Sequence, residues 1–380
     1  MPFESVEIPP SDSTRQIERA AANLVDPVAR LRYLRRELNK SRTPHTRTLP
    51  AVAGAVVVCS LVFLALATPP NRAQSKPQTT ATASKAATEQ NPRTIWLVEQ
   101  QGSSMAYSNG LQIRTDYLTD SRPRKYPTYS RQTFERTSAD QTKPAGIVFH
   151  TTESLLLPLD PDGNRNLIQT REDLLKHIRG GRLYNYLIDR FGQVFRIIPD
   201  DQIAFHAGHS VWADDQLVYE GLNESFLGVA FEARSESETD ISEAQLRAGR
   251  LLTSLLRVTW GISDADCVTH AQISVNPDNM RLGYHTDWGG HFPFEAIGVA
   301  NGYRLSVAAV ELFGFQYDGI FLKAIGGSPW PGLIESETRI QRAAEAKGLP
   351  IANFRQILQQ HYRTIRSKKT YHEQPDRDRT

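Results

Sequence analysis

The chain has 380 residues, 39% hydrophobic and 23% charged, which is enough for one sizeable globular domain with appendages or two smaller domains. A formal net charge of +2 offers no general surface for polyanions, so no nucleic acid partner is expected. Only two cysteines occur, Cys59 and Cys267, and the first lies in the apolar segment described next. An intrachain disulfide is therefore not expected.

The first distinctive element is the uncharged run AVAGAVVVCSLVFLALA over residues 51–67. Together with the residue before it, this run reaches the short end of the length that spans a hydrocarbon core of about 30 Å. A buried helix of a soluble core is the alternative, but such a helix carries a polar stripe, and here only Cys59 and Ser60 are polar. The sequence therefore predicts a transmembrane anchor over residues 50–67.

Lysine and arginine flank this anchor unequally: residues 31–50 carry six, and residues 68–87 carry three. The positive-inside bias predicts that residues 1–49 form a cytoplasmic basic segment and that the remainder lies outside the cytoplasm. A signal peptide cleaved near Ala67, giving a secreted protein, is the alternative. The basic region before the apolar run is far longer than in an ordinary signal peptide, so we expect an uncleaved anchor.

Two polar segments follow the anchor. Residues 68–94 are rich in Pro, Thr, Ala, Gln and Ser without an apolar period, which is typical of a disordered tether. Ile95 to Val98 is the first strand-like run, and the rest of residues 95–144 is polar with scattered aromatic residues. We expect residues 95–144 to be a lead-in segment that wraps the next domain.

From residue 145 to residue 299 the pattern alternates between strands and helices, which predicts an α/β domain. A helix is expected to begin with Thr170 as its cap and to stop at Gly180–Gly181, and a second to run from a Ser242–Gln245 capping box to Gly261. Strands are expected at GIVFH (146–150), LGVAFEA (227–233) and CVTH (267–270), and a hairpin at YNYLI (184–188) and QVFRII (193–198) around Gly192.

Residues 300–380 are expected to form a helical C-terminal extension, clearest over residues 335–347 and 354–365. No motif for chemistry occurs in this region, and its role is left open by the sequence.

Two predicted strands end in histidine, at His150 and His270, and strand ends hold side chains rigidly. Two such histidines alone are more often ordinary core or surface residues. The run GYHTDWGGH (283–291) adds a carboxylate at Asp287. Because a catalytic zinc takes three nitrogen or oxygen ligands and keeps one position for water, these three residues are a candidate Zn²⁺ site.

Four blocks, in order, resemble the zinc-dependent N-acetylmuramoyl-L-alanine amidase domain of bacterial amidases, phage amidases and peptidoglycan-recognition proteins. The resemblance covers residues 145–297 and implies a mixed β-sheet flanked by helices. It also implies cleavage of the amide between N-acetylmuramic acid and L-alanine in peptidoglycan or muropeptides. The blocks are IVFH followed by Thr151-Thr152, YNYLIDRFGQVFRIIPDDQIAFHAG (184–208), NESFLGVAFEA (223–233), and THAQIS followed by HTDWGG.

By position, the resemblance assigns three kinds of site residue: metal ligands, a tyrosine near the metal-bound water, and the turn that borders the substrate groove. These are His150, His270 and Asp287, then Tyr184, then His206 and Gly208.

The chain departs from the family pattern in several places. The stretch from His270 to Asp287 is longer than usual, which leaves His285 open as the alternative third ligand. If Asp287 binds the metal, His285 takes the place of a family lysine that stabilises the transition state, and can donate the same hydrogen bond. Asn185 replaces a common histidine. Ala230 stands where the family frequently has a catalytic glutamate.

Glu232 is the candidate replacement for that glutamate. Side chains alternate along a strand, so Ala230 and Glu232 share a face and lie about 6.6 Å apart along it. Glu232 is therefore predicted to act as the general base. In the alternative, Glu232 lies past the site and pairs with a cation such as Arg234, and proton transfer falls to Tyr184 and His285.

Two other functions stay open on the sequence. One is a peptidoglycan-binding domain of the same fold without catalysis, which Ala230 favours; the other is a zinc hydrolase that acts on a different N-acyl peptide. The sequence leaves open the stem-peptide preference, the choice between intact wall and soluble fragments, and the oligomeric state.

Overall fold

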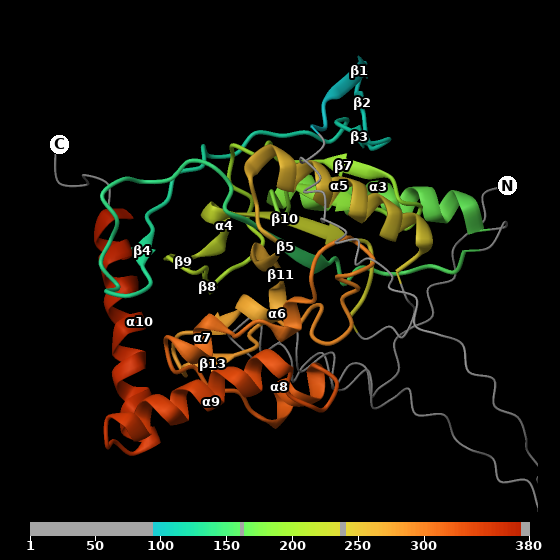
Figure 1. The fold of residues 1–380 in the computed structure, drawn as a ribbon. Coiled ribbons are helices and arrows are strands. Elements are labelled where there is room, and N and C mark those ends of the chain that lie inside the picture. Colours follow the sequence, from blue (N-terminus) through green and yellow to red (C-terminus); the bar gives the residue numbers. More distant parts are fainter. Residues whose placement is uncertain (1–93, 160–162, 236–240, 374–380) are drawn as a thin grey trace, which may run out of the picture. The chain divides into compact units, whose positions relative to one another are not determined.

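An eight-stranded mixed sheet runs through the described part of the chain, residues 94–159, 163–235 and 241–373 of a computed structural model (Figure 1). Strands β6, β10, β5 and β11 are parallel, β7 is antiparallel to β6, and β3 is parallel to β7. This confirms the predicted α/β class with a mixed sheet. In spatial order the strands are β1 (Leu97–Gln101), β2 (Ser104–Tyr107), β3 (Gln112–Arg114), β7 (Val194–Arg196), β6 (Tyr186–Ile188), β10 (Phe226–Phe231), β5 (Gly146–Thr151) and β11 (Cys267–Thr269).

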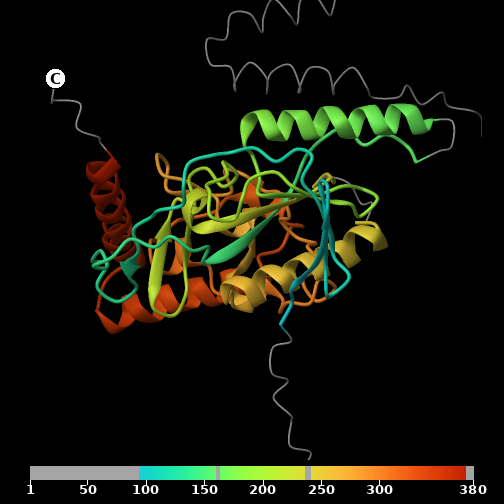
Figure 2. The same ribbon diagram turned by 90° about the horizontal axis from the view of Figure 1, so that it is seen from above.

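Helices α3 (Asn164–Gly181) and α5 (Glu243–Trp260) cover opposite faces of this sheet (Figure 2). Alternation along the strands explains the two layers, because successive side chains point to opposite faces. Phe149, Val229 and the α5 residue Leu252 share one buried cluster. On the other face, Ala230 packs in a cluster with Leu175 of α3.

On the α3 face, Val148 and Val268 pack with Trp212 and Phe226. Short elements complete the described part of the chain. They are the strands β4 (Tyr129–Ser130), β9 (Leu217–Glu220) and β8 (Val211–Ala213), which form a second sheet, the pair β12 (Val275–Asn276) and β13 (Arg281–Leu282), the helices α4 (Leu222–Ser225) and α6 (His270–Ile273), and the single 3-10 turns Asp264–Asp266 and Gly302–Arg304.

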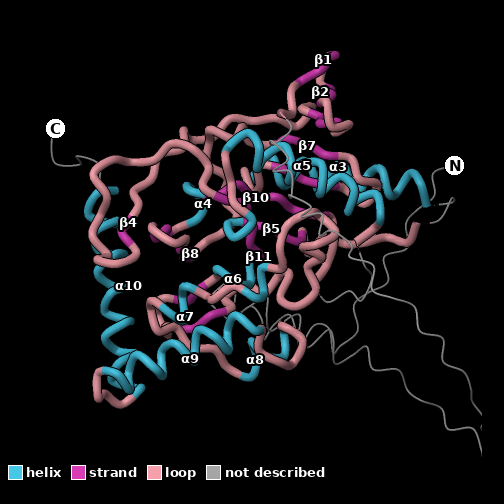
Figure 3. Tube along the Cα trace, viewed as in Figure 1, coloured by secondary structure: helices cyan, strands magenta, loops and turns pink. Residues whose placement is uncertain are grey.

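The C-terminal region is helical, as predicted, and it packs into the main core. Phe313, Leu333 and Tyr362 belong to the same buried cluster as Phe149 of β5. Its helices are α7 (Ala308–Glu311), α8 (Gly319–Ala324), α9 (Pro331–Ala346) and α10 (Ile351–Glu373). The chain between α6 and α7 is mostly loop, drawn pink in Figure 3.

Some predicted elements differ from the structure. Helix α3 begins at Asn164 and not at Thr170, because Leu167 is also buried and extends the apolar face by a further turn. The lead-in segment does more than wrap the domain, since β1, β2 and β3 extend the main sheet. The predicted boundaries at residues 144/145 and 299/300 stay predictions.

The predicted cytoplasmic segment, the anchor over residues 50–67 and the tether up to residue 93 lie outside the described residues. Among the described residues, no helix combines the length and the apolar character needed to cross a membrane.

Candidate metal centre

The carboxyl ends of two neighbouring parallel strands place two histidines side by side. His150 lies one residue before the end of β5 and pairs in register with Ala230 of β10. His270 follows β11 directly and is the first residue of α6. The predicted strand over residues 267–270 is therefore one residue too long. Since β5 and β11 are paired in parallel, both histidines emerge at the same edge of the sheet.

A loop brings Asp287 between these histidines. Its main-chain carbonyl accepts a hydrogen bond from the N–H of Ala271, 3.2 Å away, and the next residue, Trp288, has a left-handed backbone with φ 56°. The Asp287 carboxylate lies 2.8 Å from Nδ1 of His270 and 3.1 Å from Nδ1 of His150. Ligand atoms of all three residues lie within 4.8 Å of one another. In the described part of the chain, this set includes Asp287 and not His285.

The other nitrogen of each histidine has its own acceptor. Nε2 of His270 lies 3.4 Å from the carbonyl of Ala207. Nε2 of His150 lies 3.0 Å from Nδ1 of His206, whose Nε2 lies 3.3 Å from the carbonyl of Phe226. A carbonyl can only accept, so His206 donates from Nε2, and its Nδ1 accepts from Nε2 of His150. Both ligand histidines thus carry the proton on Nε2 and direct the lone pair of Nδ1 toward Asp287.

Charge at the centre matches a divalent cation. Burial, together with repulsion from His270, lowers the pKa of His150 to about 4, so its ring is neutral at physiological pH. Burial acts to raise the pKa of Asp287, but its electrostatic interactions with His270 and His150 outweigh that effect and hold the pKa well below its usual range. Two imidazoles and one carboxylate form a donor set of the kind that catalytic zinc sites use.

Comparison with known families agrees with this geometry. Residues 140–290 match the model of the family described as N-acetylmuramoyl-L-alanine amidase. This domain belongs to that family. The chain therefore carries an N-acetylmuramoyl-L-alanine amidase domain with a His-His-Asp metal-ligand set.

Solved structures of amidases are also similar to the chain. The amidase LysC from Clostridium intestinale is 21% identical over 41% of this chain and 83% of its own, with a TM-score of 0.27. AmiD from E. coli, in complex with anhydro-N-acetylmuramic acid-L-Ala-D-gamma-Glu-L-Lys, is 17% identical over 53% and 68%, with a TM-score of 0.32. AmpDh3 from Pseudomonas aeruginosa, with anhydromuramic pentapeptide, is 18% identical over 45% and 68%, with a TM-score of 0.33. No curated protein matches the chain.

Tyr184 and His285 flank the metal-ligand set of the amidase domain. The Tyr184 ring centroid lies 5.2 Å from that of His150, and burial, with the charges of Asp287 and Glu153, raises the pKa of Tyr184. The His285 ring stacks on His270 at 4.7 Å, and burial and His270 lower its pKa to about 4. Both side chains are therefore neutral hydrogen-bond donors at physiological pH, and His285 does not supply the charge of a lysine.

His206 lies in the interior, next to the ligand histidine His150. Only 7% of His206 is exposed, and its ring contacts His150. Gly228 of β10 makes room for it, because a Cβ there would lie 2.7 Å from Cγ of His206. Gly208 has a left-handed backbone with φ 52° in the turn that follows. Asn185, fully buried, accepts a hydrogen bond from the N–H of Gly228.

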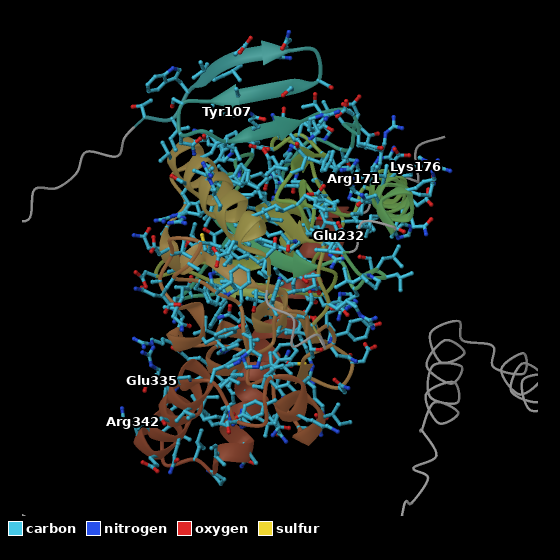
Figure 4. The ribbon with its side chains drawn as sticks, turned by 90° about the vertical axis from the view of Figure 1, so that its right-hand side faces the viewer. Tyr107, Arg171, Lys176, Glu232, Glu335 and Arg342 are labelled. Carbon is cyan, nitrogen blue, oxygen red and sulfur yellow. The ribbon has the colours of Figure 1, made fainter. Side chains whose placement is uncertain are left out.

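Glu232 lies just past the end of β10, among charges on the α3 side of the sheet (Figure 4). Its carboxylate accepts a hydrogen bond from the N–H of Arg190, 3.2 Å away. Burial, and then the charge of Asp189, raises the pKa of Glu232, and Arg190 and Arg171 oppose this. The group of ligand atoms found in the described residues does not include Glu232.

The sequence did not reveal the groups that hold the ligand histidines. Two of them are main-chain carbonyls, those of Ala207 and Phe226, which no residue type encodes. The sequence shows the alanine–aromatic–His-Ala-Gly turn that contains His206. It does not show that His206 packs against His150, because the two residues come from distant segments of the chain.

Proposed function

We propose that the chain is a zinc-dependent N-acetylmuramoyl-L-alanine amidase that cleaves the amide between N-acetylmuramic acid and L-alanine in peptidoglycan. His150, His270 and Asp287 would hold Zn²⁺. The observation that carries this proposal is the orientation of both imidazoles, each with Nε2 hydrogen-bonded and Nδ1 directed at the same carboxylate. In zinc sites, acceptors that hydrogen-bond the far nitrogen of each ligand histidine hold its ring in such an orientation.

A bound zinc ion supplies Lewis acidity, which makes water nucleophilic at neutral pH and polarises a carbonyl. The remaining chemistry falls to side chains. Tyr184 and His285 flank the ligands and are neutral donors, so either can hydrogen-bond the oxyanion that develops on the lactyl carbonyl. The amine of L-alanine must receive a proton as the C–N bond breaks.

The test incubates the purified full-length chain with sacculi and identifies the released ends by mass spectrometry. We expect free lactyl carboxyls on muramic acid, new L-alanine amines, and one zinc per chain. His150→Ala and Asp287→Ala should lose both zinc and activity, whereas His209→Ala, an exposed histidine outside the site, should keep both. Wild-type protein without stoichiometric zinc, and without activity after zinc is added, would refute the proposal.

Ala230 favours a second candidate function, peptidoglycan binding without catalysis, since no carboxylate projects from that strand position. Zinc binding and tight retention on sacculi, with no new amine ends at any enzyme concentration, would support this candidate. A zinc hydrolase of another N-acyl peptide would instead leave sacculi intact and cleave soluble acylated peptides.

We further propose that residues 50–67 anchor the protein in the cytoplasmic membrane and that the amidase domain acts outside the cytoplasm. The excess of Lys and Arg before the apolar run supports this orientation. Intact wall or muropeptides in that compartment would be the substrate.

A further inference from the structure

The amidase site lacks a carboxylate on β10. Ala230 is fully buried, pairs in register with His150, and packs among apolar side chains such as Leu187. A group that takes a proton from water and returns it to the leaving amine must therefore come from another element.

Glu153 lies just beyond the end of β5, three residues after His150. Its backbone has φ 51°, in the left-handed region that glutamate rarely adopts. Its N–H donates to the carbonyl of Ala233, 3.1 Å away, just after β10. The ends of β5 and β10 thus hold Glu153 in an unusual conformation, of a kind that concentrates at functional sites.

The two oxygens of the Glu153 carboxylate differ in their surroundings. Oε1 accepts hydrogen bonds from Oγ1 of Thr151 at 2.5 Å, and from the N–H and Oγ of Ser235 at 2.7 and 2.6 Å. Among the described residues Oε2 has no hydrogen-bond or ion-pair partner, and Glu153 is exposed. Three donors on one oxygen fix the side chain while the other oxygen stays free for a substrate or water.

Two observations connect this carboxylate with the metal-ligand set. After burial, the charges of Asp287 and Glu153 both raise the pKa of Tyr184, whose ring contacts His150. Ser235, which holds Glu153, lines a cavity of about 240 Å³ together with Trp288, the neighbour of Asp287. The cavity beside the Ser235 partner of Glu153 thus extends to the loop that carries the third ligand.

We propose that Glu153 is the general acid–base of the amidase reaction, a role that rests on the proposed function. Oε2 takes a proton from the attacking water while the water oxygen bonds to the lactyl carbonyl carbon. It then delivers that proton to the L-alanine nitrogen as the C–N bond breaks. One water is consumed, and a carboxyl and an amine are formed.

The rival explanation is that Glu153 only ties the ends of β5 and β10 together. Glu153→Gln distinguishes the catalytic from the structural explanation. The amide oxygen of glutamine still accepts hydrogen bonds from Thr151 and Ser235, but the amide cannot take a proton. In the full-length protein we expect this variant to keep wild-type zinc content, melting temperature and KM, and to lose about 100-fold or more in kcat on muropeptides.

Three matched variants complete the test. Ser235→Ala weakens the tie but keeps the carboxylate, so it should lower the melting temperature and lose less than about tenfold in kcat. Glu335→Gln, on α9 and far from Glu232 in Figure 4, should behave as wild type. Glu232→Gln should lose less kcat than Glu153→Gln.

Near-normal kcat in Glu153→Gln, or a larger loss in Glu232→Gln, overturns the role of Glu153 and leaves the proposed function intact. A kcat loss in Glu153→Gln that comes with an equal loss of zinc or melting temperature shows a structural role and overturns it as well. Wild-type protein that binds zinc but cleaves neither sacculi nor soluble muropeptides overturns both proposals.

Discussion

At the scale of single residues, His206 decides which nitrogen of His150 faces the metal. His206→Ala removes the acceptor for Nε2 of His150, so the ring can rotate or change tautomer. We expect zinc affinity to fall about 10- to 100-fold, measured by competition with a chelator. His209→Ala, three residues on and exposed, is the control and should not change the affinity. Equal affinities in the two variants would show that His150 is oriented by other contacts.

Glu232 offers a residue-scale prediction about pH. Its pKa in the folded protein is raised above the ordinary 4.5 by burial and Asp189, so folding favours the protonated form. The stability this provides is present at low pH and is lost as pH rises through the folded pKa. Glu232→Gln keeps an acceptor for the N–H of Arg190 and removes the charge, so it should melt higher than wild type at about pH 8. The difference should shrink as the pH falls toward about 5; a constant difference would mean the gain is unrelated to ionisation.

At the scale of elements, β10 must pass close to His206. A Cβ on Gly228 would lie 2.7 Å from the His206 ring, so Gly228→Ala forces the ring or the strand to move. We expect lower zinc affinity and a lower melting temperature. The control is Gly180→Ala on α3, where an added Cβ meets nothing within 4 Å. That variant should be neutral or slightly stabilising, since alanine favours a helix by about 1 kcal/mol. Unchanged zinc affinity in Gly228→Ala would show that the close approach of β10 to His206 does not position the metal ligands.

Capping residues and turn glycines in the sequence predict where several helices and turns begin and end. The capping box at Ser242 begins α5, Gly261 ends it with φ 71°, and Gly192 with φ 78° closes the β6–β7 hairpin. Pairing between distant segments was not predictable. Strand β3 joins β7 in parallel, some eighty residues on, and no periodicity within residues 95–144 indicates that partner. For the same reason the sequence could name three metal ligands by resemblance but not the contact between His206 and His150.

At the scale of the whole molecule, the C-terminal helices support the loop that carries Asp287. The indole N–H of Trp330, the residue before α9, donates to the carbonyl of Gly289 at 2.7 Å. Trp330→Phe keeps an aromatic ring but leaves that carbonyl unpaired, which should cost about 1 kcal/mol and lower zinc affinity. Trp96→Phe, at a residue 59% exposed, is the control and should change neither quantity. Normal zinc affinity in Trp330→Phe would mean that the C-terminal region stabilises the fold without acting on the site.

The membrane orientation is the second prediction at this scale. Six Lys or Arg in residues 31–50, against three in residues 68–87, should keep the N-terminal segment in the cytoplasm. Protease added to spheroplasts should then degrade a C-terminal tag and spare an N-terminal one. Replacing Arg35, Arg36 and Lys40 with Asn equalises the two counts at three, so a mixture of orientations is expected. Protection of the C-terminal tag in the unaltered protein would reverse the orientation, and a mature chain beginning near residue 68 would establish cleavage in place of an anchor.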